Sequence, residues 1–581
     1  MRHSSKILAV GLLAVSLAAS ACGTTTNDGK GNNKPNPNAE PIIIDTKGEA
    51  VTPAPDVKGA TKGGTILWLE DGEFSHFDPN QMYSSDELAV GTHLMYRMLT
   101  TFVEDPGGGP LKLVGDLATN TGVQSEGGKK WTYTLRDGIK YEDGTPITSK
   151  DIKYGIARQF GAQGAQGMQY IPDALDPKRE YKGPADGNLN VPGIATPDDK
   201  TIIFTFPEAH PEFPFIAAYP STAPTPQGKD TKEKYEDTWV ASGPYKRKEA
   251  KKDQYMILER NPHWDPKTDP ARHQYVDQFK FDWTPNRQNQ TNRIKASQGE
   301  DAFAVMSSQV NQADITTVAN DPEMSKRVID GPTPFVTYMY INTQRVPDVN
   351  VRRAMNFAMN RDAYVKALGG VKVAKPATTL LAPIVPGYQN YNAYDGGVSG
   401  DLAKAKQALN GKKVEKLSLC FGNTPTGTIA ANTIKESLSR EGLFDIVLNP
   451  IDTKTYSDTV GKKDTKCDLI SNGWAQDFPD GAATLRVLFD GKQIRAEGNQ
   501  TLSYLDVPEI NDELAKLSLE ADRKAAAPKY AALDQKLMKD YAPVVPLTYT
   551  QCYKLVGSKV GGAYLSPLYN QVNLTQVYVK A

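Results

Sequence analysis

The sequence predicts an α/β protein built from more than one lobe. Two observations support this prediction: the length of 581 residues and the order of segments in the second half. Single hydrophobic cores stop growing at about 250–300 residues, so two or three lobes are expected. From residue 414 on, "VEKLSLCFGN", "TIAANTIKESLSREG", "FDIVLNPI" and "CDLISNGW" predict strand, helix, strand and strand, the alternation typical of an α/β lobe.

The first half is predicted to contain strands, turns and short helices. Trp131 and Tyr133 alternate with polar residues, which is the period of a half-buried strand. Ser149 is predicted to be the N-cap of the next helix, with Asp151 in its first turn. The segment 161–193 has no clear period, and a loop of that length inside a globular chain is typically functional or variable.

Composition excludes some classes of function. Hydrophobic content is 39%, charged content is 23% and the formal net charge is −1, as in an ordinary globular protein. No basic block predicts a phosphate-binding surface, so we expect no nucleic-acid partner. The six histidines show no close pair with metal-ligand spacing, so we expect neither a metal nor a cofactor.

The first 21 residues have the pattern of a secretory signal peptide. "MRHSSK" is basic, and the apolar run after it is 14 residues long, too short to span a bilayer at about 20 residues. The segment ends in "AASAC", which resembles a bacterial lipobox with Cys22 as the lipidated residue, although Ala19 replaces the usual leucine. The alternative is an ordinary signal peptide in which Cys22 has no role.

The residues after Cys22 predict a flexible tether. They are rich in Gly, Asn, Thr and Pro, with little periodicity up to about Gly64, and such a segment cannot bury enough apolar surface to fold. Beyond the tether, Cys420, Cys467 and Cys552 would allow one disulfide outside the cytoplasm, with one thiol left over. The sequence does not say which two pair.

The stretch "SNGWAQDFPDG" is the main candidate for a functional site. It follows the apolar run "CDLI" and places Trp474, Asp477 and Asp480 at the end of a predicted buried strand. Carboxylates at that place could cap a helix, catalyse, hold a metal or bind a cationic ligand. For Asp480 we prefer a structural role in the turn, and for Asp477 the interpretation depends on the rest of the chain.

Five segments resemble the dipeptide- and oligopeptide-binding proteins of bacterial ABC importers, solute-binding protein family 5. They occur in family order over about 500 residues: "WTYTLRDGIKYEDGTPITSKDIKYGIARQF", "SGPYKRK" with "LERNPHWD", "NVRRAMNFAMNRDAYVKAL", "GWAQDFPDGAATLRVLF" and "YAPVVPLTYT". The resemblance implies a periplasmic-binding-protein fold (type II, the large three-domain variant) with a ligand cleft between two lobes. It also implies a receptor that is not an enzyme.

The resemblance implies the following division of the chain: signal peptide 1–21, tether 22–64, first lobe 60–102, 220–285 and 544–581, inserted small domain 103–219, and second lobe 286–543. It further implies a monomer outside the cell membrane, attached by a lipid on Cys22, that captures peptides and passes them to a membrane permease.

The family also suggests roles for individual residues. In peptide-binding relatives, the acid three residues after this tryptophan binds the α-ammonium of the peptide, and that position is Asp477 here. Gly473 and Ala475 would then offer backbone groups and Trp474 would form a pocket wall. Tyr83 lies in a region that lines the cleft in relatives, with a plain surface tyrosine as its alternative.

One departure from the family bears on ligand length. Strict dipeptide binders use an arginine after the strand that corresponds to "LSLCFGN", where this chain has "GNTPTGTIAA". Longer peptides therefore fit better than dipeptides. One alternative is a receptor of the same fold for an oligosaccharide, metal chelate or signalling molecule. Another is a secreted hydrolase that uses Asp477 and Asp480 as an acid pair, although no familiar nucleophile or metal motif accompanies them.

Overall fold

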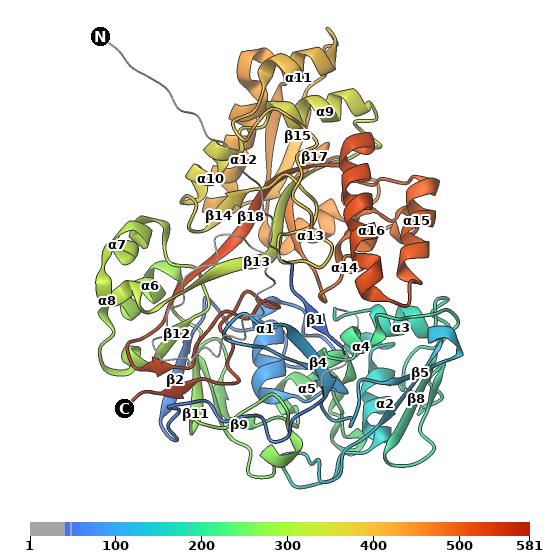
Figure 1. Cartoon of the computed structure of the whole chain (residues 1–581), viewed down its shortest axis with the longest axis vertical. Coiled ribbons are helices and arrows are strands. Elements are labelled where there is room, and N and C mark those ends of the chain that lie inside the picture. Colours follow the sequence, from blue (N-terminus) through green and yellow to red (C-terminus); the bar gives the residue numbers. More distant parts are fainter. Residues whose placement is uncertain (1–40, 47–48, 165, 186) are drawn as a thin grey trace, which may run out of the picture. The chain divides into compact units, whose positions relative to one another are not determined.

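Two β-sheets organise the computed structural model, which describes residues 41–46, 49–164, 166–185 and 187–581 (Figure 1). A five-stranded sheet has the order β12-β2-β11-β10-β9, and a six-stranded sheet has the order β14-β18-β13-β17-β15-β16. Both mix parallel and antiparallel pairs, and helices pack around them. The predicted α/β class is therefore confirmed.

The five-stranded sheet is the centre of the first lobe. Its strands are Thr65–Leu69 (β2), Tyr245–Lys251 (β9), Tyr255–Arg260 (β10), Gln278–Asp282 (β11) and Ala304–Met306 (β12). The strands β11, β2 and β12 are parallel, so their carboxyl ends meet at one edge. Because β12 pairs with β2, the first lobe extends past the limit at residue 285 that the sequence predicted.

Three smaller sheets accompany the five-stranded one. Two have the orders β1-β4-β3 and β5-β6-β8-β7, and the third pairs Val560–Gly561 (β19) with Tyr578–Val579 (β20). The strands of the first two are Ile44–Asp45 (β1), Thr100–Val103 (β3), Leu111–Gly115 (β4), Val123–Ser125 (β5), Lys130–Thr134 (β6), Ile194–Ala195 (β7) and Thr201–Thr205 (β8). Trp131 and Tyr133 of β6 are buried, as their alternation predicted. The following helix, Ser149–Arg158 (α2), begins one residue earlier than expected, because Thr148 is its N-cap in a capping box with Asp151.

The described part of the predicted tether is packed against the first lobe. Strand β1 pairs in parallel with β4, the amide of Ala54 donates to the carbonyl of Asp269 at 3.0 Å, and that of Gly63 donates to the carbonyl of Tyr275 at 2.8 Å. The prediction of a flexible coil up to residue 64 is therefore wrong from Pro41 on. Its low periodicity reflects irregular structure held by backbone hydrogen bonds, which apolar patterning does not reveal.

The six-stranded sheet is the centre of the second lobe. Its strands are Val328–Ile341 (β13), Ala374–Pro376 (β14), Leu417–Gly422 (β15), Ile446–Ile451 (β16), Leu469–Ala475 (β17) and Val544–Leu555 (β18). Its principal helices are Val349–Ala358 (α9), Arg361–Leu368 (α10), Leu402–Leu409 (α11), Pro425–Ser439 (α12), Thr453–Val460 (α13), Ala482–Phe489 (α14), Pro508–Ser518 (α15) and Arg523–Lys536 (α16).

Alternating side chains of β13 pack into separate hydrophobic cores on the two faces of this sheet. Tyr338 and Tyr340 pack with apolar residues of α14, α15 and α16. Met339 and Ile341 pack with residues of α9, α11 and α12 on the opposite face. This is the period of two that a strand imposes on its side chains. Helices therefore cover both faces, as expected for an α/β lobe.

The long strands β13 and β18 connect the two lobes (Figure 1). At one end Val328 pairs with Leu555, and Val556 forms a bridge to Val305 of β12 in the first lobe. At the other end Tyr340 pairs with Val544 within the six-stranded sheet. The ladder shifts register between Pro332 and Val336. Because β18 contributes to both lobes, the predicted limit between 543 and 544 does not separate them.

The structure shows which two of the three cysteines form a disulfide. Cys420 of β15 forms a disulfide with Cys467, which lies two residues before β17. Cys552 is a buried free thiol on β18. The disulfide thus joins two strands that are neighbours in the sheet but 47 residues apart in sequence.

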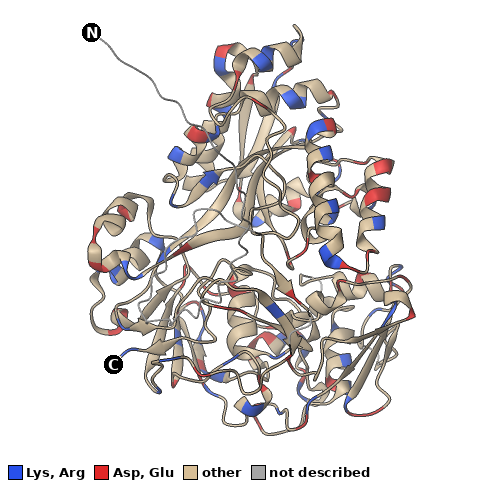
Figure 2. Cartoon of the chain, viewed as in Figure 1, with Lys and Arg blue, Asp and Glu red and all other residues tan. Residues whose placement is uncertain are grey.

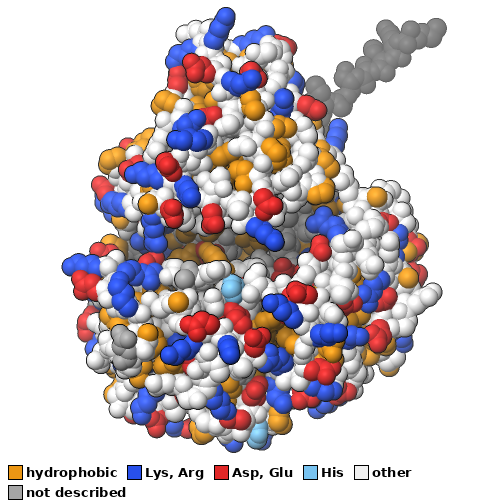
Figure 3. Space-filling view, turned by 180° about the vertical axis from the view of Figure 1, so that it is seen from behind, with side chains coloured by type: hydrophobic (Ala, Val, Ile, Leu, Met, Phe, Trp, Pro, Cys, Tyr) orange, Lys and Arg blue, Asp and Glu red, His pale blue; other side chains and the backbone are white. Residues whose placement is uncertain are grey.

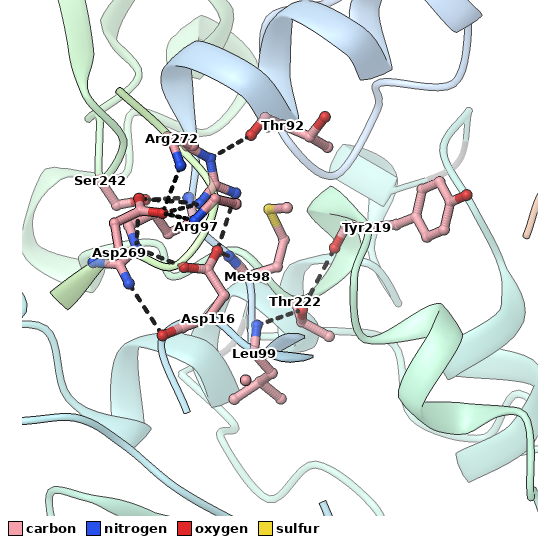
Figure 4. Close-up of polar contacts among 12 residues, drawn as sticks. Thr92, Arg97, Met98, Leu99, Asp116, Tyr219, Thr222, Ser242, Asp269 and Arg272 are labelled. Atoms are coloured by element: carbon pink, nitrogen blue, oxygen red, sulfur yellow. Dashed lines mark hydrogen bonds and ion pairs between the residues drawn. The ribbon is translucent and has the colours of Figure 1, made fainter. Parts of the chain in front are cut away.

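Four buried charged side chains form a network of ion pairs in the first lobe (Figure 4). Arg97 Nε lies 2.7 Å from Asp116 Oδ1, and Arg272 lies 3.0 Å from Asp116 and 3.2 Å from Asp269. Arg272 Nε also donates to the carbonyl oxygen of Thr92 at 2.7 Å. All four charged side chains are almost fully buried, and their two positive charges equal their two negative charges.

Candidate functional site

The strand β17 has one open edge. Its whole length pairs with β13, from Leu469 opposite Ile341 to Ala475 opposite Phe335. On its other side, β15 pairs only with Leu469 and Ile470. Among the described strands, none pairs with this edge from Ser471 to Ala475. Gly473 and Ala475 therefore lie where an extended ligand could add as a further strand.

Asp477 lies just beyond this open edge and faces residues of the first lobe. Its carboxylate accepts hydrogen bonds from the hydroxyl of Tyr170 and, at 3.3 Å, from that of Tyr83. Tyr83 immediately precedes Ser84, the N-cap of Ser85–Val90 (α1), and Tyr170 begins Tyr170–Leu175 (α3). The ring of Tyr170 also packs edge-on against Phe478 at 5.4 Å. Asp477 thus joins the two lobes.

No cation of the described chain balances the charge of the Asp477 carboxylate. Burial raises the pKa of its carboxyl to about 7, although the hydrogen bonds from Tyr170 and Tyr83 act in the opposite direction. Among the described residues, no Lys, Arg or His forms an ion pair with it. A buried carboxylate is costly without a cationic partner, so the arrangement favours binding of a cation from outside the chain.

A cavity of about 280 Å³ lies beside Asp477. Its lining comprises Tyr83, Ser84, Ser85, Leu88, Tyr219, Phe335, Gly473, Trp474, Ala475, Gln476, Asp477, Leu568 and Tyr569. The structure thus brings all five residues predicted for ligand binding to one cavity. Trp474 is held in place by its indole N–H, which donates to the carbonyl oxygen of Ala483 at 2.9 Å. Figure 3 shows the molecule hollowed between its lobes, with hydrophobic side chains visible inside.

Sequence analysis missed several residues of this site. Tyr170 lies in the segment 161–193, whose length was the only signal for it. Tyr219 and Tyr569 come from parts of the chain without any local signal, and their rings pack edge-on with centroids 6.3 Å apart. Gln476 is 5% exposed, and both polar atoms of its amide lack a hydrogen-bond partner among the described residues.

Asp480 has a different environment although it lies only three residues from Asp477. Arg523 of α16 binds both of its oxygens, at 2.8 and 2.6 Å. Asp480 Oδ1 also accepts from the amide of Ala482 at 2.8 Å, at the start of α14. With its carboxylate occupied in this way, Asp480 holds the turn between β17 and α14 and is not arranged as the second acid of a hydrolytic pair.

Other features of the described chain bear on the site. In the residues that the structure describes, no cluster of three or more His, Cys, Asp or Glu side chains could hold a metal ion. None of the described helices has the length and hydrophobicity needed to cross a membrane. Acidic and basic residues are interspersed over both lobes (Figure 2).

Comparison with known proteins defines the class. Residues 112–495 match the model of the bacterial extracellular solute-binding proteins, family 5. Since this match covers more than half of the chain, the protein belongs to that family. The family comprises substrate-binding proteins, and the fold is the two-lobed periplasmic-binding-protein fold that the sequence predicted.

Individual relatives cover most of the chain. The Probable D,D-dipeptide-binding periplasmic protein DdpA of Escherichia coli (strain K12) is 24% identical over 511 residues, which is 85% of this chain and 90% of DdpA. The periplasmic oligopeptide-binding protein OppA of Salmonella typhimurium is 25% identical, over 86% of this chain and 89% of OppA. The structure of the clavulanic acid biosynthesis oligopeptide binding protein 2 is 28% identical, with a TM-score of 0.83 over 90% of this chain and 96% of that one.

Proposed function

We propose that this protein is the extracytoplasmic receptor of an ABC importer and that it captures peptides by binding their α-ammonium group at Asp477. The observation that carries this proposal is the state of Asp477. It is a half-buried carboxylate with a pKa of about 7, placed between two tyrosine hydroxyls and without a cation from the described chain. An α-ammonium would supply the missing charge through a charge-assisted hydrogen bond.

The open edge of β17 supports a peptide over other cationic ligands. Backbone groups from Ser471 to Ala475 have no strand partner on that side, and they lead directly to Asp477. A peptide could pair with this edge as an added strand while its first residue reaches the carboxylate. This mode of binding uses main-chain groups that every peptide carries, so it tolerates varied sequences.

The position of the partners of Asp477 supports closure of the lobes around the ligand. Asp477 belongs to the second lobe, whereas Tyr83 belongs to the first lobe and Tyr170 to the proposed inserted domain 103–219. The complete site therefore exists only when the lobes approach each other. The two strands β13 and β18, with their shift of register near Pro332, are the connection about which the lobes would close.

The surroundings of the strand β15 support a ligand longer than a dipeptide. The residues that follow it, 423–431, contain no arginine; Thr424 is the N-cap of α12, so the expected loop is mostly the first turns of that helix. The chain therefore lacks, at this place, the side chain that strict dipeptide binders of the family use for the ligand carboxylate. Oligopeptides, whose C-terminus need not lie at one fixed point, are the proposed ligands.

The proposal includes attachment of the receptor to the membrane surface. The signal peptide 1–21, Cys22 and the tether up to residue 40 lie outside the described residues, so their roles rest on the sequence alone. In this proposal a lipid on Cys22 holds a monomeric receptor beside its permease. The inserted domain 103–219 remains part of the proposed division of the chain.

Native mass spectrometry tests the ligand class. The chain from Gly23 on is purified without denaturation, together with Asp477→Asn and, as the matched control, Asp480→Asn. The unmodified protein is expected to carry masses that fragment as peptides. Asp477→Asn should lose them, because removing one charged hydrogen bond costs about 1.5–3 kcal/mol, roughly 10- to 100-fold in affinity.

The control separates binding from folding. Asp480→Asn should keep its peptides but unfold more easily, since it leaves Arg523 buried without its carboxylate. Peptides retained equally by all three proteins would remove Asp477 as the binding group. A single bound mass that is not a peptide would contradict the proposed ligand class and favour a receptor for another solute.

A further inference from the structure

The cavity beside Asp477 has mainly apolar and aromatic walls. Apolar and aromatic side chains surround it, from both lobes and from the C-terminal segment: Leu88, Tyr219, Phe335, Trp474, Leu568 and Tyr569. Among the described residues of this lining, Asp477 is the only charged one, and Lys, Arg and His are absent. The cavity therefore offers one negative charge and a largely apolar surface.

Two basic side chains lie behind the wall formed by Tyr569, and neither offers a free positive charge. His93 packs behind Tyr569 with ring centroids 5.5 Å apart, and burial lowers its pKa to about 3, so its ring is neutral. Arg272 is bound to Asp116 and Asp269 in the buried network. Neither side chain is available to neutralise an acidic group of a ligand in the cavity.

The cavity is sized for one side chain rather than for a whole peptide. Its volume of about 280 Å³ lies just below the range of about 300–1,000 Å³ that encloses a drug-sized molecule. Tyr219 forms one wall, and its ring points away from the buried network and from Thr222 (Figure 4). The described chain provides no hydrogen-bond partner for the hydroxyl of Tyr219, so this group remains available to a ligand.

We infer that this cavity selects the first residue of the bound peptide for a large uncharged, apolar or aromatic side chain, and that Tyr219 is a specificity-determining wall. This inference rests on the proposed function, because Asp477 must hold the α-ammonium. An acidic first side chain would be buried beside the like charge of Asp477. A basic one would bury a second ammonium with no second carboxylate in the lining.

Binding of peptides that differ only in their first residue tests the inference. Phe-Ala-Ala-Ala, Ala-Ala-Ala-Ala, Asp-Ala-Ala-Ala and Lys-Ala-Ala-Ala are titrated calorimetrically into the ligand-free protein, with N-acetyl-Phe-Ala-Ala-Ala as a fifth ligand. The peptide that begins with Phe should bind roughly tenfold or more tightly than those that begin with Asp or Lys, a discrimination typical of apolar pockets. The acetylated peptide should bind weakly, because it has no ammonium.

Variants assign the selectivity to the cavity wall. In Tyr219→Ala the ratio of affinities for the Phe and Ala peptides should fall several-fold, while binding of the Ala peptide persists. In Tyr255→Ala, a change on β10 outside the cavity, the ratio should stay constant. A ratio of affinities within one protein is insensitive to loss of folded material, so a merely structural role of Tyr219 would not change it.

The outcomes for the two proposals differ. Equal affinity for all free peptides, with weak binding of the acetylated one, would overturn the inference and leave the proposed function intact. Tighter binding of the Asp or Lys peptide would also overturn the inference. No binding of any peptide, or equal binding of the acetylated one, would contradict the α-ammonium role of Asp477 and remove the inference with it.

Discussion

Two parts of the molecule place carboxylates in opposite electrostatic surroundings. In the first lobe, Asp116 and Asp269 lie against Arg97 and Arg272 (Figure 4). Burial alone would raise the pKa of Asp269, but the two arginines lower it to about 2. In the interlobe cavity, the described partners of Asp477 are tyrosine hydroxyls alone, and burial raises its pKa to about 7.

The difference distinguishes a structural site from the proposed binding site. The network in the first lobe has equal numbers of acids and bases, so nothing from outside is needed to complete it. Among the described residues, the site at Asp477 has an acid without a base, and in the proposed function the ligand supplies the missing cation. An unbalanced charge together with a place on the interlobe cavity, rather than burial itself, therefore distinguishes Asp477 from Asp116 and Asp269.

The largest expected effect separates the two sites by stability. Asp116→Asn leaves two buried arginines with one carboxylate, and breaking a buried pair of this kind costs about 3–5 kcal/mol in the free energy of unfolding. Asp477→Asn should leave the free energy of unfolding of the ligand-free protein unchanged or raise it at pH 8. Urea denaturation of both variants measures this, and equal losses would contradict the comparison.

The pH dependence of binding should show a smaller effect. A cationic ligand requires Asp477 to be ionised, so affinity should fall about tenfold per pH unit well below pH 7. It should also fall above about pH 8, where the α-ammonium of the peptide loses its proton. Calorimetry from pH 5 to 9 should therefore give a maximum between 7 and 8. A constant affinity from pH 5 to 7 would contradict the pKa assigned to Asp477.

The same group should affect the stability of the ligand-free protein. Because its folded pKa lies above the unfolded value, the native state holds the proton between about pH 4 and 7. The contribution of Asp477 to the free energy of unfolding therefore decreases as pH rises through this window. Burial also raises the pKa of Glu70 and Glu104 to about 7, so the comparison with Asp477→Asn isolates the effect of Asp477.

The smallest expected effect concerns Gln476, next to Asp477. Gln476→Met replaces an amide without hydrogen-bond partners by an apolar side chain of similar length. Because a buried unpaired polar group is costly, the free energy of unfolding of the ligand-free protein should rise by about 1 kcal/mol. A decrease, measured by thermal unfolding, would show that the amide is paired in solution and would place Gln476 among the stabilising residues.

Much of the fold could be predicted from local sequence patterns. The alternation of Trp131 and Tyr133 predicted a half-buried strand, and the succession of segments from residue 414 on predicted the α/β lobe. The position of Asp477 at the end of a buried strand also followed from the apolar run before it. These features depend on neighbours in sequence, whose periodicity and turn chemistry are visible in the chain itself.

Other features depended on contacts between distant segments. The packing of residues 41–46 and 49–64 on the first lobe was missed, because it rests on backbone hydrogen bonds that leave no apolar pattern. The choice of Cys467 as the partner of Cys420 depended on which strands are neighbours in the sheet. The N-cap at Thr148 instead of the predicted Ser149 reflects the ordinary uncertainty of element limits.

The sequence by itself determined the class of fold, the order of its segments and the candidate carboxylates at the end of β17. The tertiary structure alone decided that Asp480 is paired with Arg523, 43 residues away, whereas Asp477 meets Tyr170 from 307 residues away and no cation of the described chain. The physical reason is that charge balance in a buried site is a sum over all groups brought together in space. Periodicity along the chain carries no information about that sum.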